Sequence, residues 1–347
     1  MKRLPSRLAK NVLTTVDCHC GGLPARILID GIPDIPGNSA MEKRENMMRD
    51  FDYLRFVFDL STRNSQIRDT HTHTRTLMIT EPRGYPCQNL DVVLPSTPNC
   101  PEAAYSYVVA ENNFIYPAMS GHNTICVVTA LLETGMVPMV EPVTHFVLEA
   151  PAGPIEIEAE CKDGKCETVM FRNAPAFARR EDLNLTVDVP HLGKVPVDVA
   201  YGGMWYAIVR ASDLGLRVRK EDAAELCRLG EMVKVATREQ HPVNHPDFEY
   251  PGCDIVCIRG EASDSGKEKF GADASNAVIM STGPLDWDQP STWTGNIDRS
   301  PCGSGTSAVM AAMFVGVRAR RSIHYSFKFF EIQVRKGRVE IESRLCS

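Results

Sequence analysis

The motif DRSPCGSGT, residues 298–306, and the shorter motif SGHNT, residues 120–124, are the stretches that decide the expected fold. Each places a side chain that can exchange a proton, Cys302 or Ser120, directly before a glycine. An apolar run follows each motif, TICVVTALLE after the first serine and TSAVMAAMFV after the cysteine, and both runs end at a glycine. A run that is apolar on every side and closed by glycine predicts a buried helix.

A second pair of similar segments lies upstream of these motifs. VDCHCGGLPARI at 16–27 matches VDVAYGGMWYAI at 197–208 at an offset of 181 residues, and Ser120 matches Cys302 at an offset of 182. Two matches at nearly one spacing predict a duplicated domain. We expect an N-terminal domain over residues 1–185 and a C-terminal domain over 186–347, with the option that the C-terminal strands return to the first domain.

Strand-like segments surround both predicted helices. ARILIDG, HFVLEAPAGPIEIEAE and WYAIVR are rich in β-branched residues, alternate in part and are bounded by turn residues. We therefore expect an α+β fold of two similar domains, each with a β-barrel-like sheet around a central helix. Residues 221–240 are expected to form an amphipathic surface helix, and the polar stretch 260–275 an exposed loop.

Composition narrows the class of partner. The chain has 347 residues, a formal net charge of -6 and 43% hydrophobic residues. This charge argues against nucleic acid or an acidic membrane as an obligatory partner and favours a small molecule. The 12 cysteines are dispersed along the chain, so we expect reduced thiols. No apolar run is long enough to span a membrane, and the start lacks a secretory signal, so we expect a cytoplasmic protein. The oligomeric state stays open, a homodimer being one possibility.

The two predicted helix starts have a shared chemical consequence. Unpaired N–H groups and a partial positive charge at a helix N-terminus can hold a carboxylate and lower the pKa of a nearby thiol. Two such starts that face each other would hold an amino acid by its carboxylate, with Ser120 and Cys302 on opposite faces of the α-carbon. This is an acid/base pair that needs no metal or cofactor.

The sequence resembles the proline racemase superfamily over most of its length. The resemblance is carried by four segments: Asp17-x-His19-x-x-Gly22-x-Pro24-x-Arg26, Glu81-Pro82-Arg83-Gly84, Met119-Ser120-Gly121-His122-Asn123-Thr124, and Asp298-Arg299-Ser300-Pro301-Cys302-Gly303-Ser304-Gly305-Thr306.

This resemblance implies a two-domain fold similar to that of diaminopimelate epimerase, with the ligand between the halves. In the family's typical racemases, cysteines occupy both acid/base positions, whereas here the first is Ser120. The resemblance implies that Gly121, His122, Gly303 and Ser304 surround the substrate carboxylate. It also implies that His122 and Asp298 lie beside the ring nitrogen.

Ser120 is the departure that bears most on the reaction. A thiol can act as a base near neutral pH, whereas an alcohol needs a partner base. Family members with this Ser/Cys pair are similar to trans-3-hydroxy-L-proline dehydratases, so we expect a hydro-lyase in which Cys302 is the base. The alternatives are a 4-hydroxyproline 2-epimerase or proline racemase, and a catalytically impaired homologue that binds a ligand.

Metal sites are not expected. The HTHT run at 71–74 could ligate a metal from one face of a strand, but a solvated strand is the better interpretation. Ordinary packing is likewise expected for three cysteine pairs, none of which completes a zinc pattern: Cys18 with Cys20, Cys161 with Cys166, and Cys253 with Cys257. After Met310 the chain departs from the glycine-containing segment with which family members usually close over the ligand.

Overall fold

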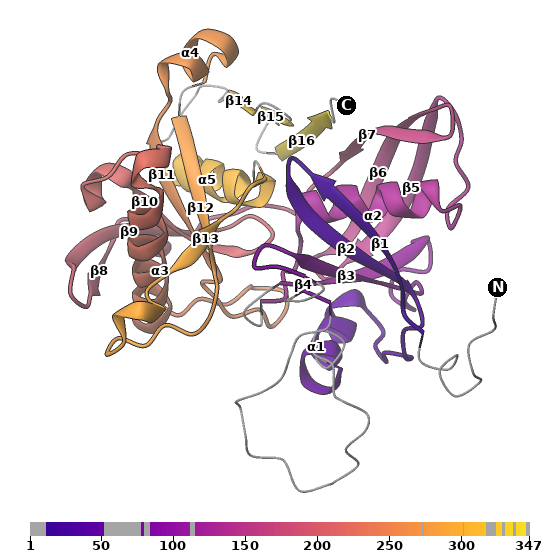
Figure 1. Ribbon diagram of the computed structural model, residues 1–347, viewed down its shortest axis with the longest axis horizontal. Helices are drawn as coiled ribbons and strands as arrows, with labels where there is room; N and C mark the ends of the chain where they lie inside the picture. The colour runs from indigo at the N-terminus through magenta and orange to yellow at the C-terminus, as the bar shows by residue number, and fades with distance from the viewer. Residues whose placement is uncertain are drawn as a thin grey trace, which may run out of the picture.

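The described residues form two sheets, and in each half one helix lies on the inner face of the sheet and one on its outer face (Figure 1). The computed structural model describes residues 12–51, 78–79, 84–111, 115–272, 274–300 and 302–316, and the backbone of 324–327, 330–335 and 338–344. The α+β architecture of two sheet-and-helix halves is therefore as expected from the sequence.

The first half is built on a sheet with the strand order β1-β2-β3-β4-β5-β6-β7-β16-β15-β14. Its strands are β1 (Thr14–Cys20), β2 (Leu23–Asp30), β3 (Asn89–Leu94), β4 (Tyr105–Ala110), β5 (Val143–Ala150), β6 (Gly153–Lys162), β7 (Lys165–Phe171), β14 (His324–Phe327), β15 (Phe330–Arg335) and β16 (Arg338–Arg344), and its helices are α1 (Ala40–Asp50) and α2 (Gly121–Glu133). Both β1 and β7 contact α2, although five strands separate them in the sheet, so the sheet curls around this helix.

The second half has the strand order β13-β12-β11-β10-β9-β8. Its strands are β8 (Leu185–Val189), β9 (Gly193–Tyr201), β10 (Trp205–Arg210), β11 (Ile255–Glu261), β12 (Ala274–Ser281) and β13 (Gly295–Ile297); its helices are α3 (Ala223–Gln240), α4 (Asp264–Phe270) and α5 (Gly303–Gly316); and single 3-10 turns cover Arg180–Asp182, Ala211–Leu214, Lys220–Asp222 and Pro290–Thr292. The expected exposed loop at 260–275 is thus wrong in part, because α4 lies within it.

The internal repeat suggested by the sequence has a structural counterpart. β1 and β2 form an antiparallel hairpin at Gly21–Gly22, and β9 and β10 form one at Gly202–Gly203. In each half the second hairpin strand then pairs in parallel with the next strand, β2 with β3 and β10 with β11. β3 then pairs antiparallel with β4, and β11 pairs antiparallel with β12. The central helix comes later in each half, α2 in the first and α5 in the second.

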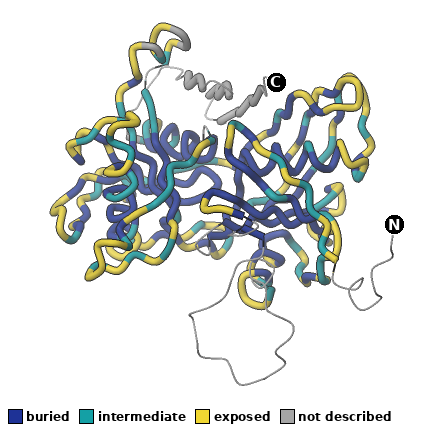
Figure 2. The backbone as a smooth tube through the Cα atoms, in the orientation of Figure 1, coloured by how far each residue is buried: buried dark blue, intermediate teal, exposed yellow. Residues whose placement is uncertain are grey.

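Burial follows from the composition of the central helices. In α2, every residue from Gly121 to Val128 is buried, as expected for an apolar run with no polar face. Gly135, with a φ of 75°, lies just beyond the helix end, where glycine adopts the left-handed conformation at little cost. Figure 2 shows that the interiors of both halves are buried, whereas the outer turns are exposed.

One apolar core joins the two halves beneath the central helices. A single cluster includes Ile125 and Leu131 of α2, Met310 of α5, and Tyr206 of β10. Two further clusters place α1 and α3 against the outer faces of the first and second sheets. Because α2 also contacts α5, the starts of the two helices are held near each other by packing.

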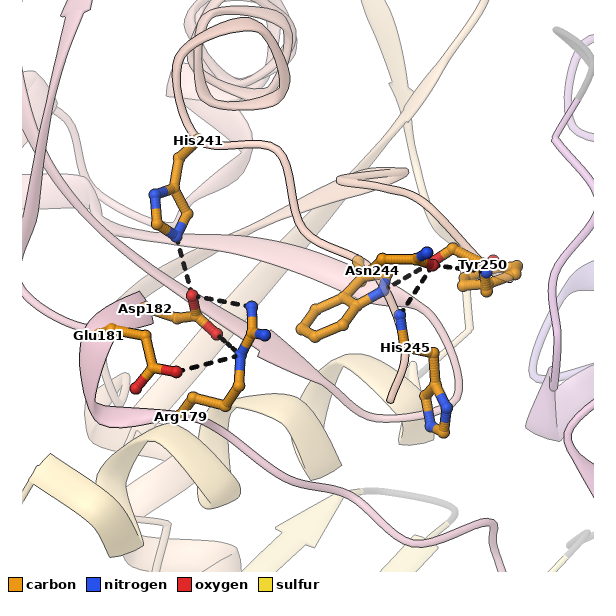
Figure 3. A network of polar contacts seen from close by, with 8 residues as sticks. Arg179, Glu181, Asp182, His241, Asn244, His245 and Tyr250 are labelled. Atoms are coloured by element: carbon orange, nitrogen blue, oxygen red, sulfur yellow. Dashed lines mark hydrogen bonds and ion pairs between the residues drawn. The ribbon is translucent and has the colours of Figure 1, made fainter. Parts of the chain in front are cut away.

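The connection between the halves is anchored by a polar network (Figure 3). The carboxylate of Asp182, only 1% exposed, lies 2.5 Å from Nε of Arg179 and 2.8 Å from Nε2 of His241. His241 directly follows α3, so this network ties the start of the second half to its outer helix. Among the described residues, no helix has the length and apolar character needed to cross a bilayer.

Candidate active site

The residues expected at the reaction centre all border one cavity between the two helix starts. They are Ser120, Gly121, His122, Asp298, Cys302, Gly303 and Ser304. The cavity also contacts side chains for which no role was expected from the sequence: Glu111, Ser300, Tyr206 and the apolar Leu23, Met204, Ile255 and Met280.

Ser120 and Cys302 differ in backbone conformation. Ser120 is the N-cap of α2 in an extended conformation, with a φ of -139°, and its side chain makes no capping hydrogen bond. Cys302 precedes α5 with a φ of 51°, in the left-handed region that a residue with a side chain rarely adopts. Strain of this kind is found at sites where the surrounding structure fixes a reacting group.

The turn at Gly202–Gly203 brings the two helix starts together. The carbonyl oxygen of Gly203 accepts a hydrogen bond of 3.1 Å from the backbone N–H of Met119, next to Ser120. Gly202 packs on the first turn of α5, where a Cβ would lie 2.1 Å from the carbonyl oxygen of Ser304. The glycine pair of the second half, Gly202–Gly203, therefore contributes to the site because it packs closely against the starts of both helices.

Ser120 has two polar neighbours. The side-chain N–H of Asn123 donates to Oγ of Ser120 at 3.0 Å, and Nδ1 of His122 lies 3.4 Å from the same oxygen. Nε2 of His122 lies 3.2 Å from Nδ2 of Asn89, which comes from β3. An imidazole ring is thus adjacent to the hydroxyl group of Ser120.

Cys302 has a different set of neighbours. Its sulfur lies 3.4 Å from the hydroxyl oxygen of Tyr206, and that hydroxyl lies 2.8 Å from Oγ of Ser304. Its backbone N–H donates to Oγ of Ser300 at 3.2 Å. Ser300 in turn donates its backbone N–H to Asp298 at 2.7 Å, so the chain before Cys302 is held in a defined turn.

Burial favours the neutral forms of the ionisable groups that border the cavity. It lowers the pKa of His122 to about 3 and raises the pKa of Glu111 to about 8. Burial also raises the pKa of Asp298, against the hydrogen bonds from Ser300 that lower it. The pKa of Cys302 is raised well above 9.0 by burial and by the nearby charge of Asp298, whereas the hydrogen bond from Tyr206 lowers it.

This arrangement suits a zwitterionic ligand. The N-termini of α2 and α5 supply backbone N–H groups for an anion, and the carboxyl group of Asp298 is available for a cation. A cationic ligand group beside Asp298 would offset its negative charge and so favour the thiolate of Cys302. The cavity thus places groups suited to an anion and to a cation beside the side chains of Ser120 and Cys302.

The sequence profile of the family described as Proline racemase matches residues 15–64 and 58–316. The chain belongs to the proline racemase family. It is 35% identical over 302 residues to a proline racemase of Clostridioides difficile, a match that covers 87% of this chain and 78% of the relative. It is 33% identical to a 4-hydroxyproline 2-epimerase of Agrobacterium fabrum, with 88% of this chain and 76% of that protein covered.

Solved structures of this family share the fold. A hydroxyproline epimerase from Agrobacterium vitis, with bound trans-4-OH-L-proline, has a TM-score of 0.73 and 27% identity and covers 95% of this chain and 87% of its own. A probable proline racemase from Agrobacterium radiobacter K84, with bound carbonate, has the same TM-score, 29% identity, and coverage of 96% and 90%. The chain therefore has the fold of the enzymes of this family.

Other residues of the motifs lie away from the cavity or outside the described residues. Asp17 pairs with Arg26 across the first hairpin at 2.7 Å and its side chain is exposed, which fits a role in strand packing. Glu81, Pro82 and Arg83, the HTHT run at 71–74, and residues 317–323 after α5 lie outside the described part of the chain.

The cysteines in the described part of the chain are free thiols, Cys18, Cys20, Cys161, Cys166, Cys253 and Cys257 included. Among the same residues, no group of three or more His, Cys, Asp or Glu side chains is arranged to hold a metal ion.

Proposed function

We propose that the chain is a 4-hydroxyproline 2-epimerase. The contact that carries this proposal is the 3.4 Å distance between Oγ of Ser120 and Nδ1 of His122. From the sequence, the alcohol at position 120 argued against a two-base reaction and favoured dehydration. A neutral imidazole beside this alcohol removes that objection, because it can accept the hydroxyl proton. The similarity to a 4-hydroxyproline 2-epimerase supports the same conclusion.

In the proposed complex the substrate carboxylate lies at the starts of α2 and α5, near Gly121 and Gly303. The ring ammonium pairs with Asp298. Hydrogen-bond donors at the carboxylate also stabilise the negative charge that develops when the α-proton leaves. Cys302 and Ser120 then act on opposite faces of the α-carbon.

The proton transfers balance in each direction. In one direction, the α-proton moves to Oγ of Ser120 while the hydroxyl proton of Ser120 moves to Nδ1 of His122. The thiol of Cys302 gives its proton to the other face of the carbanion, which inverts the centre and leaves a thiolate and an imidazolium. In the other direction, the thiolate takes the α-proton, and Ser120 returns a proton that it regains from His122.

Dehydration of trans-3-hydroxy-L-proline is the second candidate, and the alcohol at Ser120 is the observation that favours it. Here Cys302 takes the α-proton, the C–O bond at C3 breaks, and the hydroxyl group leaves as water with a proton from the enzyme. The enamine that is released becomes a pyrroline-2-carboxylate in solution. This reaction needs one base, which the thiolate provides.

Incubation of the enzyme with each hydroxyproline isomer in deuterated water tests the two candidates. Inversion at C2 with one deuterium incorporated at the α-carbon supports the epimerase, and loss of water from the 3-hydroxy isomer supports the dehydratase. Cys302→Ala must abolish either reaction, and full turnover in that variant would contradict the assignment of the base. Binding of pyrrole-2-carboxylate, a planar mimic of the deprotonated ring, without turnover of any isomer would instead indicate a ligand-binding homologue.

A further inference from the structure

A line of three buried polar side chains leads from β3 to the cavity. Asn89, 1% exposed, contacts Nε2 of His122 through its carboxamide, and Nδ1 of His122 contacts Oγ of Ser120. Ser120 and His122 border the cavity, whereas Asn89 is not among its lining residues. Asn89 can therefore act on the reaction through His122 without touching a ligand.

The tautomer of His122 decides what Ser120 can do. A neutral imidazole carries one proton, and it donates from one nitrogen and accepts at the other. If the proton is on Nδ1, the ring donates to Ser120 and cannot take its hydroxyl proton. If the proton is on Nε2, Nδ1 is free to accept that proton. The side-chain N–H of Asn123 donates to Oγ of Ser120.

The carboxamide of Asn89 selects between these tautomers. With Nδ2 toward the ring, Nε2 must accept and the proton is on Nδ1. With Oδ1 toward the ring, Nε2 must donate and Nδ1 is free. Oδ1 of Asn89 is buried and has no hydrogen-bond partner among the described residues, and a half-turn of the amide brings it to the ring. The two ends of the amide are nearly equal in size, so packing permits both orientations.

We propose that Asn89 is a positioning residue for proton transfer at Ser120: its carbonyl oxygen keeps a proton on Nε2 of His122, so that Nδ1 accepts the hydroxyl proton of Ser120. This inference rests on the proposed two-base function. The same oxygen also serves the imidazolium that forms when Ser120 acts as base, since it accepts the Nε2 proton in both charge states. Burial, which lowers the pKa of His122 to about 3, opposes that imidazolium, so an acceptor on Nε2 is needed.

Two substitutions at position 89 separate positioning from packing. Asn89→Leu removes the acceptor, and we expect kcat for epimerisation to fall about 10–100-fold, the effect of losing one hydrogen bond to a charged group. KM should change by less than about threefold, because Asn89 does not line the cavity. Asn89→Asp supplies an acceptor and no donor, and it should restore turnover to within about tenfold of the parent enzyme.

Asp91→Asn is the matched control. Asp91 is fully buried on the same strand, two residues along, and it does not border the cavity. Because successive residues of a strand alternate between faces, Asp91 and Asn89 point to the same side of the sheet. We expect this variant to retain the parent kcat, and circular dichroism should show the same fold for all four proteins.

Nitrogen-15 NMR of the imidazole ring measures the tautomer without reference to turnover. We expect the parent enzyme bound to pyrrole-2-carboxylate to show His122 protonated at Nε2, Asn89→Asp to show the same, and Asn89→Leu to lose this preference. A ring protonated at Nδ1 alone in the bound parent enzyme would overturn the inference, as would unchanged turnover in Asn89→Leu. If no hydroxyproline isomer is turned over, the proposed function fails, while the ring spectra still report whether Asn89 sets the tautomer.

Discussion

The hydroxyl oxygen of Tyr206 lies 3.4 Å from the sulfur of Cys302, and this contact links a strand of the second sheet to the thiol that we propose as the base. Burial raises the pKa of Tyr206 well above 10.0, so the hydroxyl keeps its proton and can donate it to a thiolate. The same hydroxyl contacts Ser304, which fixes its direction. Tyr206 is therefore suited to stabilise the charged form of Cys302.

Tyr206→Phe should weaken the base. A hydrogen bond to a charged group contributes about 1.5–3 kcal/mol, so we expect kcat to fall roughly 10–100-fold and the pKa of Cys302 to rise further. Chiral chromatography of the products measures kcat, and the ultraviolet absorbance of the thiolate during a pH titration measures the pKa of Cys302. Tyr201→Phe is the control, since Tyr201 is also buried but does not border the cavity. Equal losses in the two variants would contradict the assignment.

The reactivity of Cys302 should increase with pH, and burial together with Asp298 should move this increase to high pH. Burial and the negative charge of Asp298 raise the thiol pKa well above 9.0, so the thiolate fraction in the ligand-free enzyme is small at neutral pH and grows as pH rises. We expect the rate of iodoacetamide labelling at Cys302 to increase up to and beyond pH 9.

Asp298→Asn removes the negative charge that opposes the thiolate of Cys302. The pKa of Cys302 should therefore fall, and the same labelling rate should be reached at a lower pH. Mass spectrometry of the peptide that contains Cys302 gives the rate at each pH. Glu111→Gln, in the same cavity, is the control variant. A labelling profile unmoved by Asp298→Asn but shifted by Glu111→Gln would assign the repulsive charge to the wrong carboxylate.

The parts of the site that could be predicted from the sequence are those that depend on patterns within short segments of the chain. Ser120 and Cys302 stand before helices that the apolar runs and closing glycines predict, and the offset between them reflects the repeat of hairpin, paired strands and central helix. The roles of Gly121, His122, Asp298, Gly303 and Ser304 were inferred from the resemblance, and all five border the cavity.

The parts that the sequence did not predict come from other strands. Tyr206 lies on β10 and Asn89 on β3, and each reaches the site through sheet pairings that join segments far apart in the chain. Within their own strands both residues look like ordinary packing positions. The pairing of β16 with β7, which was expected from the sequence only as an option for the C-terminal strands, is likewise a long-range contact, and no local periodicity specifies it.

Gly202→Ala should disturb the site and the fold together. A Cβ at this position would lie 2.1 Å from the carbonyl oxygen of Ser304 and 2.7 Å from the backbone nitrogen of Ala308, so the hairpin must move away from α5. We expect a loss of about 1–3 kcal/mol in the free energy of unfolding and a large loss of turnover. Urea denaturation measures the first. Gly283→Ala is the control, because no atom lies within 4 Å of its Cβ position. If Gly202→Ala were as stable as the parent protein, the close packing of Gly202 on α5 would be refuted.

Lys234 and Glu231 form a buried ion pair on α3, and removal of one partner alone should destabilise the fold strongly. Their side chains are 3% and 0% exposed and their charged atoms lie 2.6 Å apart, and both contact Ser281 of β12. Lys234→Met leaves the Glu231 carboxylate buried without its cation, which costs about 3–5 kcal/mol when a buried pair is broken from one side.

The exposed pair on the same helix provides the comparison for this loss. Arg228 and Glu225 lie 2.6 Å apart with side chains 38% and 50% exposed, so Arg228→Met should cost about 0–1 kcal/mol. Urea denaturation of both variants measures the difference. Because the two pairs share a helix and an i,i+3 spacing, helix propensity affects both alike, and the difference in unfolding free energy isolates the effect of burial. Equal destabilisation by the two substitutions would mean that water reaches Glu231 once Lys234 is removed.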